Sequence, residues 1–422
     1  MINKTVLDNG VRVVSSSMKD AQSLAVGVWI DVGNRNETPD VAGISHYLEH
    51  LVFKGTKHYS CQQIKEAIEG VGGSFNGFTS EEATCYLVKM PAQYLDVALK
   101  ILTEMVSSPS LTQEDIDKER TVILEEIKMY KDLPQGYVHE LLDELLWPRQ
   151  PLGRSILGTV ESVTNIRKQD LDAYRAGFYT APNIVVSAAG RLSHRTLCVK
   201  AGKLLRGSTG SRRNIPSPAR ISQDKPQARI FHKETEQTHF VLGFHGLHKA
   251  HPQRHALGLL NVILGGNSSS RLFNEIREKR GLAYEIGTAA KRLKDTGAFL
   301  VHAGVDNAKV VETLRLVFKE LDRARQDPVS PGEFRRAKEF FLGQLTLALE
   351  DTMDQMLWLG DSVVSLDKTY SLRQMITEVN KVSARDVRET ARLIFKDSNL
   401  NLALIGPQQQ AQDQILKQLY LG

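Results

Sequence analysis

VTNIRKQDLDAYRAGFYTAPNIVVSAAG, residues 163–190, has a counterpart later in the chain, VNKVSARDVRETARLIFKDSNLNLALIG, residues 379–406. The two segments have the same length and align without a gap. Identical residues in this alignment include Asp170 and Asp386, Asn183 and Asn399, and Gly190 and Gly406. Each segment predicts a capped helix, a turn at the asparagine, and an apolar strand that ends at the glycine. The pattern therefore predicts a unit that is built twice.

Two further matches stand earlier in the chain. LTQEDIDKERTVILEEI at 111–127 aligns with VSPGEFRRAKEFFLGQL at 329–345, again without a gap. HYLEHLV at 46–52 aligns with GLLNVIL at 258–264 and keeps the apolar positions. Three matches in the same order, with nearly the same separation along the chain, indicate an internal duplication.

A segment near the middle of the chain separates the two copies. Residues 206–229, RGSTGSRRNIPSPARISQDKPQAR, contain few apolar side chains and many Ser, Pro, Gly and Arg residues, which is typical of a linker. We therefore predict an N-terminal domain at residues 1–205, a linker at 206–228, and a C-terminal domain at 229–422. Both domains have an ordinary size.

The first copy predicts its strands and helices in blocks. The expected strands lie near residues 6–16, 23–33, 74–80 and 83–90, and the expected helices lie near 41–53, 61–70, 92–106, 112–130 and 135–146. Ser60 and Gln63 form a capping box for the second helix, and Thr112 caps the fourth. Blocks of this kind favour the α+β class, here as two duplicated α/β sandwich domains, each a mostly antiparallel sheet with helices on one face.

Composition excludes several classes of protein. The 422 residues are 41% hydrophobic and 24% charged, as expected for a folded chain, and no apolar run reaches membrane-spanning length. The net charge of +5 is spread along the sequence, which argues against a nucleic-acid partner. The three cysteines are far apart and form no CxxC pair. We therefore expect a cytoplasmic bacterial protein that binds neither nucleic acid nor membrane.

HYLEH, residues 46–50, carries the clearest chemistry. On a helix His46 and His50 lie one turn apart on the same face and can offer two imidazoles to one ion, with Glu49 beside them. A catalytic Zn²⁺ site needs a third protein ligand and an open position for water. An amphipathic helix with two histidines on its polar face is the alternative. The second copy has Gly258, Asn261 and Val262 at the positions of His46, Glu49 and His50, so the chemistry is confined to one copy.

HxxEH is the inverted zincin motif, and here the sequence resembles the pitrilysin/insulysin (M16) family of zinc peptidases. The resemblance is to its short branch, which includes the mitochondrial processing peptidases and bacterial relatives. It extends over nearly the whole chain, through LEHLVFKGT, GGSFNGFTSEEATCY, ERTVILEEI and SSSRLFNEIREKRGLAY. It implies a LuxS/metallopeptidase-like fold, Zn²⁺ as cofactor, and Glu126 as the third ligand. Spacing alone leaves the neighbouring Glu125 open. The resemblance implies that Glu119 supports the site without binding the metal, and a solvated charge is the alternative for Glu119.

The resemblance also implies residues that contact a peptide. SFNGFTS resembles the edge strand to which an extended substrate adds, which places Asn76, Gly77 and Phe78 beside the scissile bond. Relatives usually have Ala at position 77. Arg277 and Tyr284 resemble a pair that contacts the substrate and the developing oxyanion. Without the family, Asn76 to Phe78 form an ordinary hairpin strand, Arg277 is a solvated charge and Tyr284 a core aromatic.

A second group of histidines invites a metal interpretation that we do not adopt. These residues are His232, His239, His245, His248, His251 and His255. Their spacings do not pair with a carboxylate ligand, and Pro252 interrupts the one pair that is four residues apart, His251 and His255. Scattered histidines of the surface or core are the expected outcome.

We expect a zinc metalloendopeptidase that cuts extended peptides or unfolded segments, with Glu49 as the general base on zinc-bound water. By resemblance, two chains form a homodimer, or a heterodimer with an inactive homologue, and Arg277 and Tyr284 act in cis or in trans. A non-catalytic assembly protein and a purely structural zinc site are the alternatives.

Overall fold

The structure is a computed structural model that describes residues 1–210 and 213–421, which divide into two compact units. Unit 1 contains residues 1–128, 154–217 and 346–371, and unit 2 contains residues 129–153, 218–345 and 372–422. Each unit therefore takes a segment from the other half of the sequence. The predicted domains, residues 1–205 and 229–422, are the two duplicated copies along the sequence, and this is a different division from the two compact units. Their boundaries stay a prediction. Residues 211, 212 and 422 lie outside the described residues.

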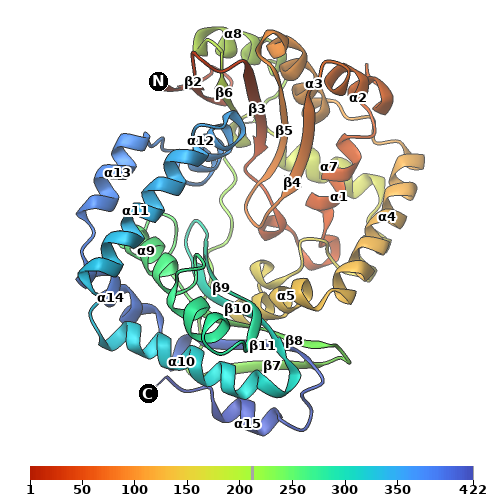
Figure 1. The fold of residues 1–422 in the computed structure, drawn as a ribbon. Helices are drawn as coiled ribbons and strands as arrows, with labels where there is room; N and C mark the ends of the chain where they lie inside the picture. The colour runs from red at the N-terminus through yellow and green to blue at the C-terminus, as the bar shows by residue number, and fades with distance from the viewer. Residues whose placement is uncertain (211–212, 422) are drawn as a thin grey trace. The chain divides into compact units, whose positions relative to one another are not determined.

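Unit 1 is built on a six-stranded sheet (Figure 1). Its strands are β1 (Ile2–Val6), β2 (Arg12–Ser17), β3 (Ser23–Ile30), β4 (Ser74–Thr79), β5 (Thr84–Pro91) and β6 (Ile184–Gly190). The order across the sheet is β1-β2-β6-β3-β5-β4, and only β2 and β6 run parallel. Three of the four strands expected from the first copy are present as β3, β4 and β5, and β4 lies at one edge. The single strand expected near residues 6–16 is wrong, because residues 7–11 turn at Gly10, with a φ of +93°, and join the antiparallel strands β1 and β2.

Eight helices of unit 1 accompany this sheet in the described part of the chain, although the last residues of α4 belong to unit 2. They are α1 (Ile44–Val52), α2 (Cys61–Glu69), α3 (Leu95–Ser107), α4 (Gln113–Asp132), α6 (Val160–Asn165), α7 (Lys168–Phe178), α8 (His194–Leu204) and α12 (Thr352–Leu366). The predicted capping box of Ser60 and Gln63 is confirmed, and the Thr112 hydroxyl accepts the Asp115 N–H. The helix expected at 41–53 is shorter, because Pro39–Val41 forms a 3₁₀ turn before it.

The two faces of this sheet are covered by different parts of the chain. Alternate residues of β3, Leu24, Val26, Val28 and Ile30, face a core shared with α1, α3 and other helices of the first copy. The opposite face, with Trp29, packs against Met356 and Leu359 of α12, which Figure 1 shows in blue beside β2, β6 and β3. Gly360 permits the close approach, since a Cβ there would lie 2.1 Å from Trp29 Nε1.

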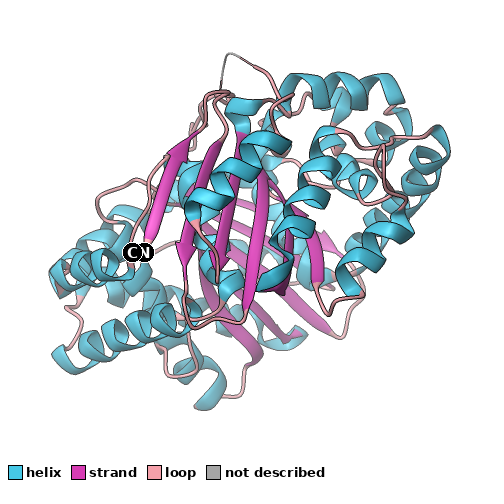
Figure 2. Cartoon of the chain, turned by 90° about the horizontal axis from the view of Figure 1, so that it is seen from above, coloured by secondary structure: helices cyan, strands magenta, loops and turns pink. Residues whose placement is uncertain are grey.

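Unit 2 repeats this topology. Its strands are β7 (Gln227–His232), β8 (Gln237–His245), β9 (Ala283–Arg292), β10 (Gly297–Asp306) and β11 (Leu400–Gly406). They are ordered β7-β11-β8-β10-β9, with β7 and β11 parallel. This order matches β2-β6-β3-β5-β4 strand for strand, and Figure 2 shows the magenta strands running side by side with cyan helices along them. The predicted α+β class with two duplicated sheet-and-helix domains is confirmed.

The helices of unit 2 also correspond to those of unit 1. They are α5 (Pro134–Leu146), α9 (Arg254–Leu264), a π-helical segment (Phe273–Glu278), α10 (Val310–Gln326), α11 (Pro331–Ala348), α13 (Leu372–Lys381), α14 (Ala384–Ile394) and α15 (Gln412–Lys417). The last residues of α11 belong to unit 1. One core lies between the sheet and α9, α10 and α14. A second core, with Trp147, lies between the opposite face of the sheet and α5.

The repeated segments at residues 163–190 and 379–406 share a side-chain hydrogen bond. In unit 1 the Asn183 amide donates to the carbonyl of Phe178 at 2.9 Å, and in unit 2 the Asn399 amide donates to the carbonyl of Ile394 at 3.2 Å. Each asparagine thus joins the end of a helix to the start of a buried strand. The shared turn explains why both copies contain this residue.

The helices that cover the second face of each sheet are exchanged between the copies. In the alignment of the copies, α4 begins opposite the start of α11, and α5 begins opposite the start of α12. Yet α5, from the first half, packs in unit 2, and α12, from the second half, packs in unit 1. Each sheet therefore has helices on both faces, one face being covered by the partner copy's helix.

None of the helices in the described ranges is long and apolar enough to cross a membrane.

Removing a buried side chain of α12 should destabilise unit 1. Leu359 is fully buried in the core between α12 and the sheet, so Leu359→Ala should lower the free energy of unfolding of this unit by about 2–5 kcal/mol. Urea unfolding followed by tryptophan fluorescence measures the change, because Trp29 lies in the same core.

Leu347→Ala is the matched control. The Leu347 side chain is 64% exposed in the same unit, so its truncation should change the stability by less than about 0.5 kcal/mol. Equal losses for both variants would show that α12 does not stabilise the sheet.

Candidate metal centre

The helix that carries HYLEH begins at an unusual cap. Gly43 takes the N-cap position with a φ of +92° and has no side chain to accept the first free N–H groups. The carboxylate of Glu37 does so instead, accepting the N–H of Gly43 at 2.7 Å and of Ser45 at 2.9 Å. Glu37 was not predicted from the sequence, because it lies outside the helix and follows no N-cap motif.

Helix α1 packs against α4, the helix that carries the glutamates. Tyr47, Leu48, Leu51 and Val52 are buried in the core of unit 1. The Tyr47 hydroxyl also donates a hydrogen bond to the carbonyl of Ile116 in α4. This contact and the shared core fix the separation between the two helices.

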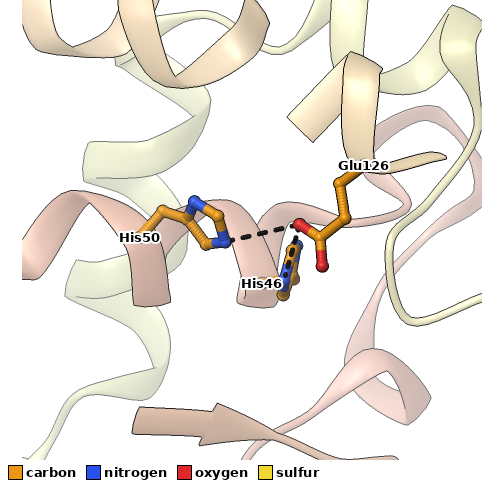
Figure 3. Close-up of side chains that lie close together, drawn as sticks. All are labelled: His46, His50 and Glu126. Carbon is orange, nitrogen blue, oxygen red and sulfur yellow. Dashed lines mark ion pairs between the residues drawn. The ribbon is translucent and has the colours of Figure 1, made fainter. Parts of the chain in front are cut away.

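Three ligand atoms converge between these helices. Glu126 Oε2 lies 3.7 Å from His46 Nε2 and 3.6 Å from His50 Nε2, and the three atoms all lie within 4.8 Å of one another (Figure 3). In residues 1–210 and 213–421 this is the one such group of His, Cys, Asp or Glu, so the C-terminal histidines form none. Two imidazoles and a carboxylate form the donor set of many catalytic zinc sites. The residues present therefore fit Zn²⁺.

Geometry separates Glu126 from its neighbour. The Glu125 side chain is 66% exposed and pairs with Lys128 at 2.7 Å, whereas Glu126 faces the histidines. Successive residues of a helix point about 100° apart, so one helix cannot aim both carboxylates at the same ion. Spacing in the sequence left this choice open.

The two imidazoles are held differently. His50 Nδ1 bonds to Glu119 Oε2 at 3.0 Å, which leaves Nε2 free to bind a metal, and Glu119 is buried. Glu119 Oε1 in turn pairs with Lys54 at 2.6 Å. His46 Nδ1 is buried and finds no hydrogen-bond partner among the described residues. The resemblance implied that Glu119 supports the site, whereas Lys54 carries no signal in the sequence that would assign it there.

The charges around the ligands follow from burial. Burial, and to a smaller extent His50, lowers the pKa of His46 to about 3, so its imidazole is neutral and able to bind a metal. Burial also acts to lower the pKa of His50, but the hydrogen bond with Glu119 and the nearby carboxylates outweigh it and raise that pKa. Burial tends to raise the pKa of Glu119, yet its hydrogen bonds from His50 and Lys54 lower it overall.

Glu49 stands beside the metal group without joining it. Its Oε2 accepts a hydrogen bond from the Thr79 hydroxyl of β4 at 2.7 Å. Burial raises the pKa of Glu49, and the Thr79 hydrogen bond counteracts part of that rise. A carboxylate with a raised pKa next to a cation site is suited to proton transfer near neutral pH. Thr79 lay inside the predicted edge strand but was not singled out.

The edge strand β4 runs along the same site. It pairs with β5 alone, so the backbone groups of its other edge are unpaired within the sheet. Gly77 faces the base, since a Cβ there would lie 3.2 Å from Glu49 Cγ. The exposed Asn76 accepts the Gly77 N–H at 2.9 Å, and Phe78 packs edge-on against Trp29 at 5.5 Å. Substrate contacts of these three residues stay a prediction.

Arg277 and Tyr284 lie together in unit 2. The Arg277 guanidinium lies 5.2 Å from the centroid of the Tyr284 ring, a cation–π contact. Tyr284 is the second residue of β9 and is 76% exposed, so the alternative of a core aromatic is wrong. Their action on a substrate is not tested by this contact.

Comparison with known proteins now gives the family. Residues 12–160 match the family described as Insulinase (Peptidase family M16), and residues 165–341 match the Peptidase M16 inactive domain. The chain belongs to peptidase family M16. The M16 relative named "Uncharacterized zinc protease YmxG", from Bacillus subtilis, is 35% identical over 96% of this chain and 98% of its own length. An uncharacterized zinc protease of Streptomyces coelicolor is also 35% identical, over 96% of this chain and 90% of its own.

Two solved structures show the same fold. A protease from Helicobacter pylori superposes with a TM-score of 0.90 at 24% identity, covering 96% of this chain and all of that one. A protein from Pseudomonas fluorescens, described as a peptidase M16 inactive domain, gives a TM-score of 0.89 at 19% identity, covering 96% and 98%. The predicted family and its fold are confirmed.

Substitution of the two adjacent glutamates should separate their roles. Glu126→Gln should weaken zinc binding by more than the roughly 10–100-fold that the loss of an outer-sphere partner costs. Glu125→Gln should leave the affinity unchanged, because that side chain is paired with Lys128 at the surface. A competition titration with a chromophoric chelator measures both, and the reverse order of affinities would refute the assignment of Glu126.

Proposed function

We propose that this M16 protein is a zinc-dependent endopeptidase that hydrolyses peptides, or unfolded segments of proteins, bound in an extended form. One observation carries the proposal. The ligand atoms of His46, His50 and Glu126 converge within 4.8 Å. Beside them, Glu49 is held by Thr79 at 2.7 Å and remains available as a base.

The chain's own residues would divide the work as follows. His46, His50 and Glu126 would hold Zn²⁺, which supplies Lewis acidity that polarises a peptide carbonyl and activates water near neutral pH. Glu49 takes a proton from the attacking water and later returns it to the leaving amine. Burial assists this exchange, because it raises the pKa of Glu49 toward the working pH.

The substrate would bind beside this base as an added strand. The unpaired edge of β4 offers backbone donors and acceptors to an extended peptide. Gly77 would stand beside the scissile bond, with Asn76 and Phe78 on either side of it. The Asn76 side chain occupies the Gly77 N–H, so a peptide that uses this donor must displace it.

Two alternatives are less well supported. A purely structural zinc site has four protein ligands, whereas three ligand atoms meet in the part of the chain that the structure describes. A non-catalytic role draws on the description of an inactive domain, but that description applies to residues 165–341. The metal group lies within residues 12–160, the insulinase match.

Glu49→Gln tests the proposed base. The variant should keep zinc, since Glu49 is not one of the converging ligands, and should lose activity by about 10²–10⁴-fold. Cleavage of a quenched peptide and metal content are measured on the same preparations.

Glu125→Gln again serves as the control, because it makes the same chemical change at an exposed position. Wild-type cleavage by Glu49→Gln would remove Glu49 from the mechanism. A wild-type protein that binds zinc but cuts no member of a peptide library would favour the non-catalytic alternative.

We propose, by the resemblance to short-branch M16 peptidases, that two chains form a homodimer in which Arg277 and Tyr284 of one chain serve the zinc site of the other. A guanidinium and a phenol can stabilise a developing oxyanion. A heterodimer with an inactive homologue is the other possible assembly. We also propose a cytoplasmic location, in line with the free thiols of Cys61, Cys85 and Cys198.

Complementation of inactive variants tests the action in trans. Glu49→Gln and Arg277→Ala should each be inactive alone. After mixing and subunit exchange, random pairing should place an intact site in half of the dimers and restore about a quarter of the wild-type rate. A mixture that stays inactive although light scattering shows dimers would place both groups in the same chain.

A further inference from the structure

Lys54 is a charged residue next to the metal group to which the proposed function gives no role. It follows α1, two residues beyond Val52, and its side chain is one-third exposed. Its Nζ lies 2.6 Å from Glu119 Oε1, while Glu119 Oε2 lies 3.0 Å from His50 Nδ1. Lys54, Glu119 and His50 therefore form a continuous chain of hydrogen bonds that ends on a metal ligand.

Each link of this chain has a defined task. Glu119 accepts the Nδ1 proton of His50 and so selects the tautomer whose Nε2 lone pair faces Glu126. A carboxylate buried as deeply as Glu119, which is 5% exposed, is costly unless a cation or donor satisfies each oxygen. Lys54 satisfies the oxygen that His50 does not use, which keeps the carboxylate in one orientation.

The other imidazole has no such support. His46 Nδ1 makes no hydrogen bond with any described residue. Of the two imidazoles, His50 is therefore the one that a hydrogen bond at Nδ1 orients. Lys54 also links the end of α1 to α4, two helical turns before Glu126. The same ion pair therefore acts on both ligand-bearing helices.

The C-terminal copy gives an independent observation. In the alignment of the copies, Gly266 stands where Lys54 stands and Ala337 where Glu119 stands. The helices themselves persist as α9 and α11. Both members of the ion pair are absent from the copy that lacks the metal ligands, while the packing residues remain. The pair thus accompanies the metal site and is not required to pack these helices.

We propose that Lys54 is a positioning residue for the metal centre, acting through Glu119 to orient His50 for zinc. The inference rests on the proposed function only in that it assumes zinc as the ion. It concerns metal affinity and not cleavage.

A double-mutant cycle on the full-length protein tests it. Lys54→Met removes the charge and keeps the length of the side chain, and should weaken zinc binding by about tenfold, the lower end for an outer-sphere partner. Glu119→Gln should weaken it at least as much. The double variant should bind no more weakly than Glu119→Gln alone, because Lys54 has no effect without its carboxylate.

Chelator competition gives the affinities, and the absorption spectrum of the cobalt-substituted protein reports the ligand geometry. Lys54→Arg should restore most of the affinity, which a general packing role would not predict. Lys57→Met, at an exposed lysine three residues on, is the matched control and should bind like the wild type. Should Lys54→Met fail to fold by circular dichroism, Lys54→Gln takes its place in the cycle.

Three results would overturn the proposal: wild-type affinity in Lys54→Met, additive losses in the double variant, or no recovery in Lys54→Arg. A wild-type protein that binds no zinc would instead overturn the proposed function, and Glu126→Gln identifies that case. Normal zinc binding by the wild type together with an unaffected Lys54→Met rejects the role of Lys54 alone.

Discussion

The metal centre depends on the packing of α1 against α4. Neither helix can form the site alone, because one carries the imidazoles and the other the carboxylate. Burial of Tyr47, Leu48 and Leu51 and the hydrogen bond from Tyr47 to Ile116 hold the helices together. The exposed ion pairs of α4 contribute little by comparison. The apolar core therefore determines the distance between the ligands, and the polar residues refine their orientation.

The sequence allowed much of this to be predicted, since the strongest signals were local or repeated. The periodic helices, the Ser60 capping box and the turn of Asn183 and Asn399 depend on neighbouring residues, and the structure has them. Residues that act on a different helix or strand from their own were not predicted. Glu37 caps α1 from outside the helix, Thr79 reaches Glu49 from a strand, and Lys54 reaches Glu119 from the end of another helix. No spacing rule connects such pairs, because the fold alone brings them together.

The helix that packs on the second face of each sheet was also not predicted, for a different reason. β3, SLAVGVWI, is buried on both faces except at its first residue, and a nearly continuous apolar strand of this kind indicates cover on both sides. The prediction of helices on one face of each sheet is therefore wrong for the second face. Even a prediction of helices on both faces would not have identified α12 as the covering helix. Nothing in the α12 sequence shows whether it packs on the sheet of its own copy or on the sheet of the other copy.

The exchange of α5 and α12 has a consequence for how such a chain arises. A single copy would cover the surface around Trp29 either with its own helix or with the same helix of a second molecule. Two identical molecules that trade a helix in this way form a swapped dimer. Fusion of their genes would place this helix exchange within one polypeptide. The two copies could then diverge in chemistry. Removal of either copy would expose one sheet face of the other.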